Sequence, residues 1–296
     1  MWAKYNMGVL AMNQHPSKKD QILTDKHINF FQTFGYLAFP GLVKNCIEEI
    51  QQAFDKVWQK HGGGHNGKTH EGKARSCIVP FIDQNEYLCR LLDDPRILDI
   101  STKLLGSDFN YMGSDGNYYV GDTGWHSDGG NTDILHIKIA YYLDPLSRDT
   151  GCVRVIPGSH HFGDQYADLL SRDVGSSQDL WQVGGNQVPA QALETEPGDV
   201  VVFNHKTKHA SFGGGGWRRM FTMNLCQRYP EARVQELRDY LNGGARFWID
   251  RAYGQTMMET AGPERTRHLE QVMANDGHLA ELSRQARERM DEPSRG

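Results

Sequence analysis

The spacing of hydrophobic residues predicts helices at both ends of the chain and short strands between them. Apolar positions recur at three- and four-residue steps over 28–34, with Thr24 in front of them as an N-cap. The same spacing returns after Asn45 across 47–58. Two more helices are predicted, over 85–92 and 95–105. The first third of the chain is therefore expected to be mainly helical.

The pattern of hydrophobic residues changes at Phe109, where β-branched and aromatic residues occur in short runs separated by Gly, Pro, Asn and Asp. The predicted strands cover 74–81, 110–114, 117–120, 134–143, 152–156, 200–203 and 220–225. Short strands at this density predict a sandwich or barrel. After Glu231 the helical spacing returns and continues through a charged stretch at 263–290.

These segments fit one α+β domain over 1–296, with helices packed around a β core. Its predicted parts are an N-terminal arm (1–22), a helical flank (23–108), a β core (109–228) and C-terminal helices (229–296). The core contains a long polar loop at 160–190. A loop of that length is often a lid or a binding loop. The C-terminal helices are expected either to pack on the core or to form a homodimer contact.

Composition narrows the class of protein. Hydrophobic residues make up 38% and charged residues 23%, as in ordinary globular proteins. The formal net charge is −5, which argues against nucleic acid as a partner. The five cysteines form no Cys-x-x-Cys pair, so we expect neither a disulfide framework nor a structural zinc site. With no signal-like or membrane-spanning apolar run, a cytoplasmic location is expected.

Candidate metal ligands stand at the end of a predicted strand. His126 and Asp128 are two residues apart, so both side chains can converge on one ion. His209 follows the strand at 200–203 and supplies a second nitrogen ligand. Two histidines and one carboxylate form the facial triad of non-haem iron(II) oxygenases. Catalytic zinc also takes three protein ligands, but open coordination positions favour iron.

Two neighbouring residues qualify this interpretation. His205 competes with His209 for the third ligand position, and we prefer His209 because His205 falls in the loop after the strand. Arg218 stands on the next apolar run, where a guanidinium could anchor a carboxylate co-substrate. Strand alternation sends Arg218 and Arg219 to opposite faces, so one of them can point inward.

Taken together, these motifs resemble one enzyme family. The segment 151–160, Gly-Cys-Val-Arg-Val-Ile-Pro-Gly-Ser-His, is similar to the G-C-L-x-V-I-P-G-S-H segment of the phytanoyl-CoA dioxygenase-like family. The helix and strand at 23–41 resemble the start of that family's domain. His126-Ser127-Asp128, Pro197-Gly198-Asp199, His209-Ala210-Ser211 and Arg218-Arg219 follow in the family's order. The resemblance spans 22–228.

The resemblance implies a double-stranded β-helix, a cupin-like jelly roll, flanked by N- and C-terminal helices. It implies Fe(II) held by His126, Asp128 and His209, with 2-oxoglutarate bound through Arg218 and O2 as the oxidant. Asp128 is retained, whereas halogenating relatives have a small residue there. The implied reaction is therefore hydroxylation of a C–H bond, with release of succinate and CO2.

The substrate is predicted only by class. Arg75, Arg154 and His136, together with Lys73 and Lys138, could bind an anionic group. Trp125 and Tyr118, with three further tyrosines, could line a pocket. Ordinary surface or strand-edge charges explain the cationic residues equally well, and aromatic residues of this kind more often belong to the core. We favour a small polar metabolite, such as an aminophosphonate or an amino acid, over an acyl-CoA or a natural product.

Two other classes of protein stay open from the residues alone. One is a metal-dependent hydrolase or isomerase on a cupin-like barrel, which would not release succinate from 2-oxoglutarate. The other is a ligand-binding barrel without catalysis, which would consume no dioxygen. The intact set of candidate ligands argues against the second.

Overall fold

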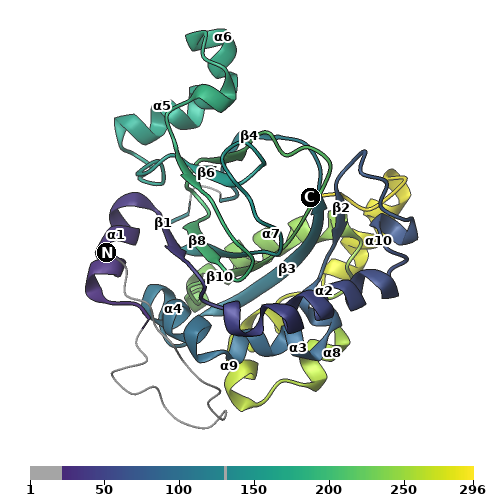
Figure 1. The fold of residues 1–296 in the computed structure, drawn as a ribbon. Coiled ribbons are helices and arrows are strands. Elements are labelled where there is room, and N and C mark those ends of the chain that lie inside the picture. Colours follow the sequence, from purple (N-terminus) through teal and green to yellow (C-terminus); the bar gives the residue numbers. More distant parts are fainter. Residues whose placement is uncertain (1–21, 130–131) are drawn as a thin grey trace.

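The computed structural model describes residues 22–129 and 132–296, and two antiparallel sheets form its centre (Figure 1). Most of the predicted arm, 1–22, thus lies outside the described residues. The larger sheet has six strands in the order β1 (Tyr36–Phe39), β8 (Val200–Asn204), β5 (His136–Tyr142), β10 (Arg218–Cys226), β3 (Asn110–Tyr119), β2 (Ser76–Ile78). The smaller sheet has four, in the order β4 (Thr123–His126), β9 (His209–Ser211), β6 (Val153–Val155), β7 (Gln191–Leu193). The predicted jelly roll within an α+β fold is confirmed.

Strand β10 shows how alternation builds the interior. It pairs with β3 on one side and β5 on the other. Arg218, Met220, Thr222 and Asn224 line the cavity between the sheets. The intervening residues Phe221, Met223 and Leu225 face the helices and are fully buried in the main hydrophobic core.

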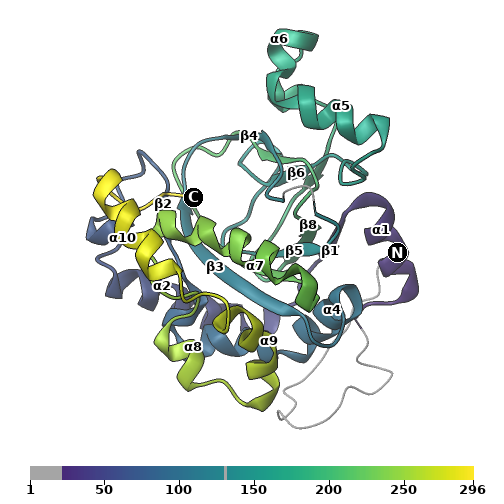
Figure 2. The ribbon, with the colours of Figure 1, turned by 180° about the vertical axis from the view of Figure 1, so that it is seen from behind.

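Helices cover the outer face of the larger sheet (Figures 1 and 2). They are α1 (Asp25–Phe34), α2 (Ile47–Lys60), α3 (Glu86–Cys89), α4 (Pro95–Leu105), α7 (Val234–Leu241), α8 (Gln255–Glu259), α9 (Pro263–Met273) and α10 (Leu279–Arg289). The predicted N-cap of α1 is confirmed. The Thr24 hydroxyl accepts from the backbone N–H of His27, and Gly35 ends the helix at φ 84°.

The loop predicted at 160–190 contains helices, which is a correction to the sequence analysis. α5 (Gln165–Asp173) and α6 (Ser177–Trp181) project from the body of the molecule (Figure 1). The Asp164 carboxylate accepts from the backbone N–H of Tyr166 and so caps α5. Leu180, which helical spacing would bury in a packed helix, is 57% exposed.

Two other boundaries differ from expectation. The helical stretch predicted at 263–290 is broken between α9 and α10, where buried Asp276 accepts from the backbone N–H of Ala252 and pairs with Arg251. The strand predicted at 74–81 is shortened to β2, because the chain turns at Pro80 into a 3-10 helix.

The C-terminal helices pack on the sheet. The His268 ring of α9 stacks on Phe109, with ring centroids 3.7 Å apart. The Gln271 side chain accepts from the Asn110 amide at 2.7 Å and donates to the Tyr229 carbonyl. This is the first of the two roles predicted for these helices, and a homodimer contact stays a prediction.

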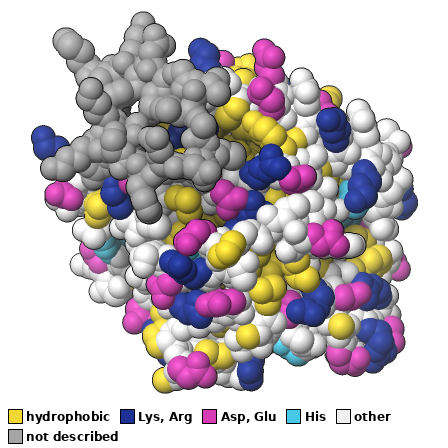
Figure 3. Space-filling model, turned by 90° about the horizontal axis from the view of Figure 1, so that it is seen from below, with side chains coloured by type: hydrophobic (Ala, Val, Ile, Leu, Met, Phe, Trp, Pro, Cys, Tyr) yellow, Lys and Arg dark blue, Asp and Glu magenta, His cyan; other side chains and the backbone are white. Residues whose placement is uncertain are grey.

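Two surface properties accompany the fold. On the face seen in Figure 3, acidic and basic side chains are interspersed instead of forming a patch of one sign. Within 22–129 and 132–296, no helix combines the length and apolar character needed to cross a bilayer.

Replacing Asp83 with alanine should destabilise the protein without altering the cavity chemistry. Asp83 is buried and accepts from the Tyr111 hydroxyl at 2.8 Å and the Gly254 N–H at 3.0 Å, and burial raises the pKa of Asp83 to about 6. The variant leaves both donors unpaired, so we expect the free energy of unfolding to fall by about 2–4 kcal/mol. Urea unfolding checks this, with exposed Asp250→Ala as the matched control. Equal stability of the two variants would contradict the assigned role.

Candidate metal centre and co-substrate site

Three predicted ligands come together between the two sheets. His126 of β4 and His209 of β9 are direct cross-strand partners, so the pairing itself sets the histidines side by side, with ring centroids 4.2 Å apart. Asp128 follows β4. Its carboxylate oxygens lie 3.7 Å from His126 Nε2 and 3.5 Å from His209 Nε2. One ligand atom from each residue lies within 4.8 Å of the others.

The orientation of both imidazoles suits a metal. His126 Nδ1 lies 2.8 Å from the Gly124 carbonyl, and His209 Nδ1 lies 3.0 Å from the Thr207 carbonyl. Each Nδ1 is thus the protonated nitrogen, which leaves Nε2 with a free lone pair directed at Asp128. Two nitrogens and one carboxylate on one side of an ion, with the other side open to a cavity, fit iron(II).

The neighbouring charges keep these ligands in their metal-binding forms. Burial alone would raise the pKa of Asp128, but the Lys138 ammonium, 2.6 Å from its carboxylate, holds that pKa well below the usual range. Burial lowers the pKa of His209 to about 4. At neutral pH the carboxylate is therefore ionised and the imidazole neutral.

His205, the competing ligand, is not part of this group. It is buried at the cavity wall, and its ring lies 5.6 Å from that of His136. Its backbone carbonyl accepts from the N–H of Asp128 at 2.8 Å and of Gly129 at 3.0 Å. The backbone of His205 thus fixes the loop that carries Asp128, while His209 supplies the ligand atom.

Arg218 lies inside the cavity, as its strand position predicted. It is buried and donates to the carbonyls of Gly121 and Gly214 and to the Ser211 hydroxyl. Within the described part of the chain it has no carboxylate partner, so its charge is available to an anionic ligand. Arg219 points to the other face and pairs with Asp144 at 2.8 Å.

Glycines make room for this arginine. A Cβ atom on Gly214 would lie 2.0 Å from Arg218 Nη1, and one on Gly151 would lie 2.8 Å from Arg218 Cζ. Gly151 also has φ 95°, a conformation that other residues rarely adopt. The first glycine of the 151–160 segment therefore shapes the co-substrate site.

Replacing Ser211 with alanine should weaken 2-oxoglutarate binding modestly. The Ser211 hydroxyl accepts from Arg218 at 2.5 Å and donates to the Gly151 carbonyl at 3.1 Å. Since Arg218 keeps its two backbone carbonyls in the variant, we expect the KM for 2-oxoglutarate to rise by about 5- to 10-fold with kcat little changed. Steady-state kinetics in 2-oxoglutarate test this, and an unchanged KM would exclude a role for the hydroxyl.

A cavity of about 880 Å³ surrounds these groups. Of the substrate residues predicted from sequence, Arg75, Trp125 and two of the further tyrosines, Tyr119 and Tyr142, line it. Arg75 reaches in from the edge of β2 and donates to Asn117 at 2.8 Å and to Asp115 at 3.5 Å. Lys138, one of the cationic residues predicted beside Arg75, also lines it.

Five predicted substrate residues lie outside the cavity lining, which corrects the sequence analysis: Lys73, Tyr118, His136, Tyr141 and Arg154. Tyr118 points to the opposite face from Tyr119 and stacks on Trp58 with centroids 4.2 Å apart. Arg154 donates to the carbonyls of Asn186 and Arg148 and holds the loop instead. His136 is buried with its Nε2 atom 2.8 Å from the Tyr229 hydroxyl.

Sequence reasoning missed Asp115 and the C-terminal residues that line the cavity. Asp115 accepts from Thr222, Asn117 and Arg75. Its strand position after Gly113 carried a signal, but a bulge between β3 and β10 shifts the alternation there. The C-terminal contributors are Tyr240, Leu241, Gly243, Gly244, Arg246, Phe247, Ile249, Ala252, Leu279 and Gly296.

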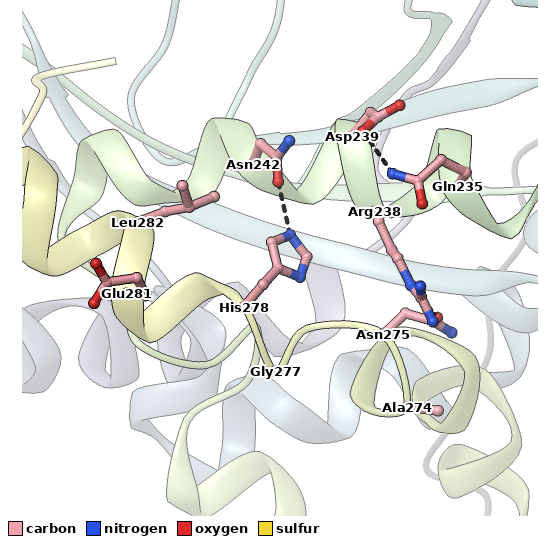
Figure 4. A pocket seen from close by; sticks show the side chains of 10 residues that line it. All are labelled: Gln235, Arg238, Asp239, Asn242, Ala274, Asn275, Gly277, His278, Glu281 and Leu282. Atoms are coloured by element: carbon pink, nitrogen blue, oxygen red, sulfur yellow. Dashed lines mark hydrogen bonds between the residues drawn. The ribbon is translucent and has the colours of Figure 1, made fainter.

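A second hollow lies on the outer side of α7 and α10, away from the ligands (Figure 4). Its polar side chains bond to one another. Arg238 donates to Asn275 at 2.9 Å, and His278 lies 2.7 Å from the Asn242 amide oxygen. This hollow therefore offers no unpartnered group comparable to Arg218.

A facial triad inside a jelly roll, beside a buried arginine free to bind a carboxylate, defines a non-haem iron oxygenase that uses 2-oxoglutarate. The chain belongs to the phytanoyl-CoA dioxygenase (PhyH) family, whose model matches residues 31–220. It is 23% identical over 220 residues to the dioxygenase lolE1 of Epichloe uncinata, across 67% of this chain and 78% of that protein. The enzyme class, with iron, 2-oxoglutarate and O2, is confirmed.

Solved structures share the fold. The non-heme alpha ketoglutarate dependent carbocyclase SnoK from nogalamycin biosynthesis matches with a TM-score of 0.54 at 20% identity, over 70% of this chain and 85% of that chain. HygX from Streptomyces hygroscopicus, with nickel and 2-oxoglutarate bound, matches with a TM-score of 0.55 at 16% identity, over 70% of this chain and 88% of that chain. EctD from S. alaskensis matches with a TM-score of 0.54 at 19% identity, over 73% of this chain and 81% of that chain. The family assignment sets aside the hydrolase, isomerase and non-catalytic alternatives.

Proposed function

We propose that this enzyme hydroxylates a C–H bond of a small polar metabolite, with conversion of 2-oxoglutarate and O2 to succinate and CO2. The observation that carries the proposal is the complete set of His126, Asp128 and His209. Asp128 occupies the third ligand position with a carboxylate, which leaves no room there for a halide. Hydroxylation is therefore favoured over halogenation.

The residues of the site divide the work. His126, Asp128 and His209 would hold the iron, which together with 2-oxoglutarate supplies the oxidising chemistry when bound. Arg218 and Ser211 would bind the far carboxylate of 2-oxoglutarate. Lys138 keeps Asp128 ionised and in place. The cavity walls orient the substrate and keep bulk water away from the reacting bond.

The cavity supports a substrate with an anionic group. Arg75 presents its guanidinium to the cavity beside Tyr119, with Cζ 4.1 Å from the ring centroid, and its nearest carboxylate, on Asp115, is 3.5 Å away. Asp115 could in turn meet an amino group. An amino acid or an aminophosphonate carries both charges, which is why these classes lead the proposal.

The experiment is a succinate-release screen with Fe(II), 2-oxoglutarate and panels of amino acids and aminophosphonates. We expect at least one compound to stimulate succinate release and to gain one oxygen atom, as seen by mass spectrometry. Stimulated succinate release with a dehydrogenated, cyclised or epimerised product would reject hydroxylation while retaining the enzyme class. No stimulation by any amino acid or aminophosphonate would reject the proposed substrate classes.

A further inference from the structure

The cavity runs along β10 from Arg218 to the level of the ligands, because the Lys138 ammonium that pairs with Asp128 comes from the residue opposite Asn224. Arg218 and Asn224 both point inward from β10 and are six residues apart, which is about 20 Å along a strand. His136 pairs with Cys226, two residues beyond Asn224, and the Tyr240 ring lies 4.7 Å from the His136 ring. Tyr240 of α7 therefore marks the end of the cavity opposite the co-substrate arginine.

Residues outside the family-matched region build this far end. The family model ends at 220, whereas Tyr240, Leu241, Arg246, Phe247, Ile249 and Leu279 all line the cavity. They come from α7, from the 3-10 helix Asn242–Phe247 that follows it, from the turn after that, and from α10. The residues that face the far end of the cavity thus lie beyond the stretch that the family model matches.

Apolar side chains form part of the far end. On the sheet side it is lined by Val79, Pro80 and Met112, and on the helix side by Leu241, Ile249 and Leu279. Apolar walls of this kind stabilise a ligand by removing its apolar surface from water. A substrate with only polar groups would gain nothing from them.

Two further arginines line the cavity, Arg246 and Arg75. Arg246 forms no ion pair within 22–129 or 132–296, and its Cζ lies 4.7 Å from the centroid of the Phe247 ring. The tail connects it with Arg75, because Ser294 N–H donates to the Arg246 carbonyl and Arg295 donates to the Arg75 carbonyl, each at 2.8 Å. A Cβ atom on Gly296 would lie 2.0 Å from Arg75 Nη1, so the end of the same tail reaches the Arg75 guanidinium. Arg75 is also a neighbour of Arg218, since both guanidiniums lie over the Tyr119 ring.

The net positive charge of the side chains that line the cavity favours an anionic ligand. Four cationic side chains line the cavity, Arg75, Lys138, Arg218 and Arg246, against two carboxylates, Asp115 and Asp128. The two positive charges of iron(II) and the two negative charges of 2-oxoglutarate offset each other. The lining side chains together carry more positive than negative charge, and Arg246 is exposed at the edge of the cavity, where a bound anion would offset part of that charge.

We propose that Arg246, together with Arg75, binds an anionic group of the substrate, and that Leu241 and Ile249 contact an apolar or aromatic body attached to it. The substrate class is then a small organic anion, a carboxylate or a phosphonate, with an apolar body. This inference rests on the proposed function and deepens it, because it names the residues that select the substrate and adds an apolar part to it.

Binding to the nickel-substituted enzyme with 2-oxoglutarate tests the inference separately from turnover. The probes are L-phenylalanine, L-leucine, 3-phenylpropionate and 2-phenylethylphosphonate, each with its matched amide or full ester, in which the acid group carries no charge. Glycine and aminomethylphosphonate carry the same anionic groups without an apolar body. We expect at least one probe with both parts to bind, and its neutral partner and the bodiless anions to bind at least about 10-fold more weakly.

The variants locate the contact. Arg246→Gln should weaken binding of the anionic probe about 10-fold or more while leaving its neutral partner unchanged, and Arg246→Lys should restore part of the loss. Ile249→Ala should weaken both partners alike. Arg238→Gln is the matched control, since Arg238 lies on the outer hollow of the same helix pair (Figure 4). Unchanged affinity for 2-oxoglutarate shows that each variant is folded.

Each outcome decides the inference. Equal binding of anion and neutral partner, equal binding of the bodiless anions, no effect of Arg246→Gln, or no binding by any probe would overturn it. Selective binding without hydroxylation of the same compound by the iron enzyme would support the inference and reject the proposed function. A carboxylate and a phosphonate with the same phenylethyl body distinguish the two anionic groups.

Discussion

Replacing Asp128 with alanine should abolish hydroxylation, with kcat/KM falling on the order of a thousandfold or more. The carboxylate is the sole oxygen ligand in the group of three, and it lies within 3.7 Å of both Nε2 atoms. Its loss also leaves the Lys138 ammonium, now 2.6 Å from Asp128, as an unpaired cation beside the metal position. We therefore expect weaker Fe(II) binding as well as lost turnover.

Metal content after dialysis and succinate release measure the two effects. Asp133→Ala is the matched control, because Asp133 is an exposed carboxylate paired with Arg233 at the surface. It should keep wild-type iron binding and turnover. Full activity of Asp128→Ala with bound iron would show that another residue completes the site.

Replacing Arg218 with alanine should raise the KM for 2-oxoglutarate by about 100-fold or more. The guanidinium is buried, and burial lowers its pKa from the ordinary arginine value without bringing it near neutrality. A carboxylate that binds there would lose a charge-assisted, two-point contact in an enclosed site. Arg218→Lys should recover part of the loss, since it restores the charge but not the fork of donors.

Arg219 is the natural control for this prediction. It is the next residue on β10, points to the other face, and pairs with Asp144. Arg219→Ala should leave the KM for 2-oxoglutarate unchanged. If the two variants affected that KM equally, Arg218 would not be the co-substrate anchor.

Much of the site could be read from the sequence because the ligands follow the order of the strands. The His-x-Asp spacing and the later histidine define a ligand set, and alternation on β10 separates Arg218 from Arg219. The sequence alone could not rank His205 and His209 on geometry. That choice depends on the pairing of His126 with His209 across β4 and β9.

The substrate residues were harder to predict because they depend on which face of a strand meets the cavity. Tyr118 and Tyr119 are adjacent and alike in type, but only Tyr119 lines the cavity. The bulge near Gly113 shifts the alternation, and no local pattern announces it. The prediction for Arg154 was wrong for another reason, since its guanidinium donates to two loop carbonyls.

The contribution of the C-terminal helices was also beyond the sequence pattern. Spacing predicts which face of α7 is apolar, but not that Tyr240 reaches the active-site cavity. That contact joins strands and a helix that are far apart in the chain. The helices α5 and α6 were hidden for the opposite reason, because they project into solvent and bury few residues.

The most direct test of the central claim is the fate of 18O2 during turnover of 2-oxoglutarate by the Fe(II) enzyme. We predict that succinate carries one labelled oxygen atom, that its formation requires iron, and that Asp128→Ala and His209→Ala form none above background. The same reaction with a stimulating compound should place the second labelled atom in the hydroxylated product. Unlabelled succinate, or wild-type rates in the ligand variants, would contradict the assignment of this chain as an iron and 2-oxoglutarate oxygenase acting through His126, Asp128 and His209.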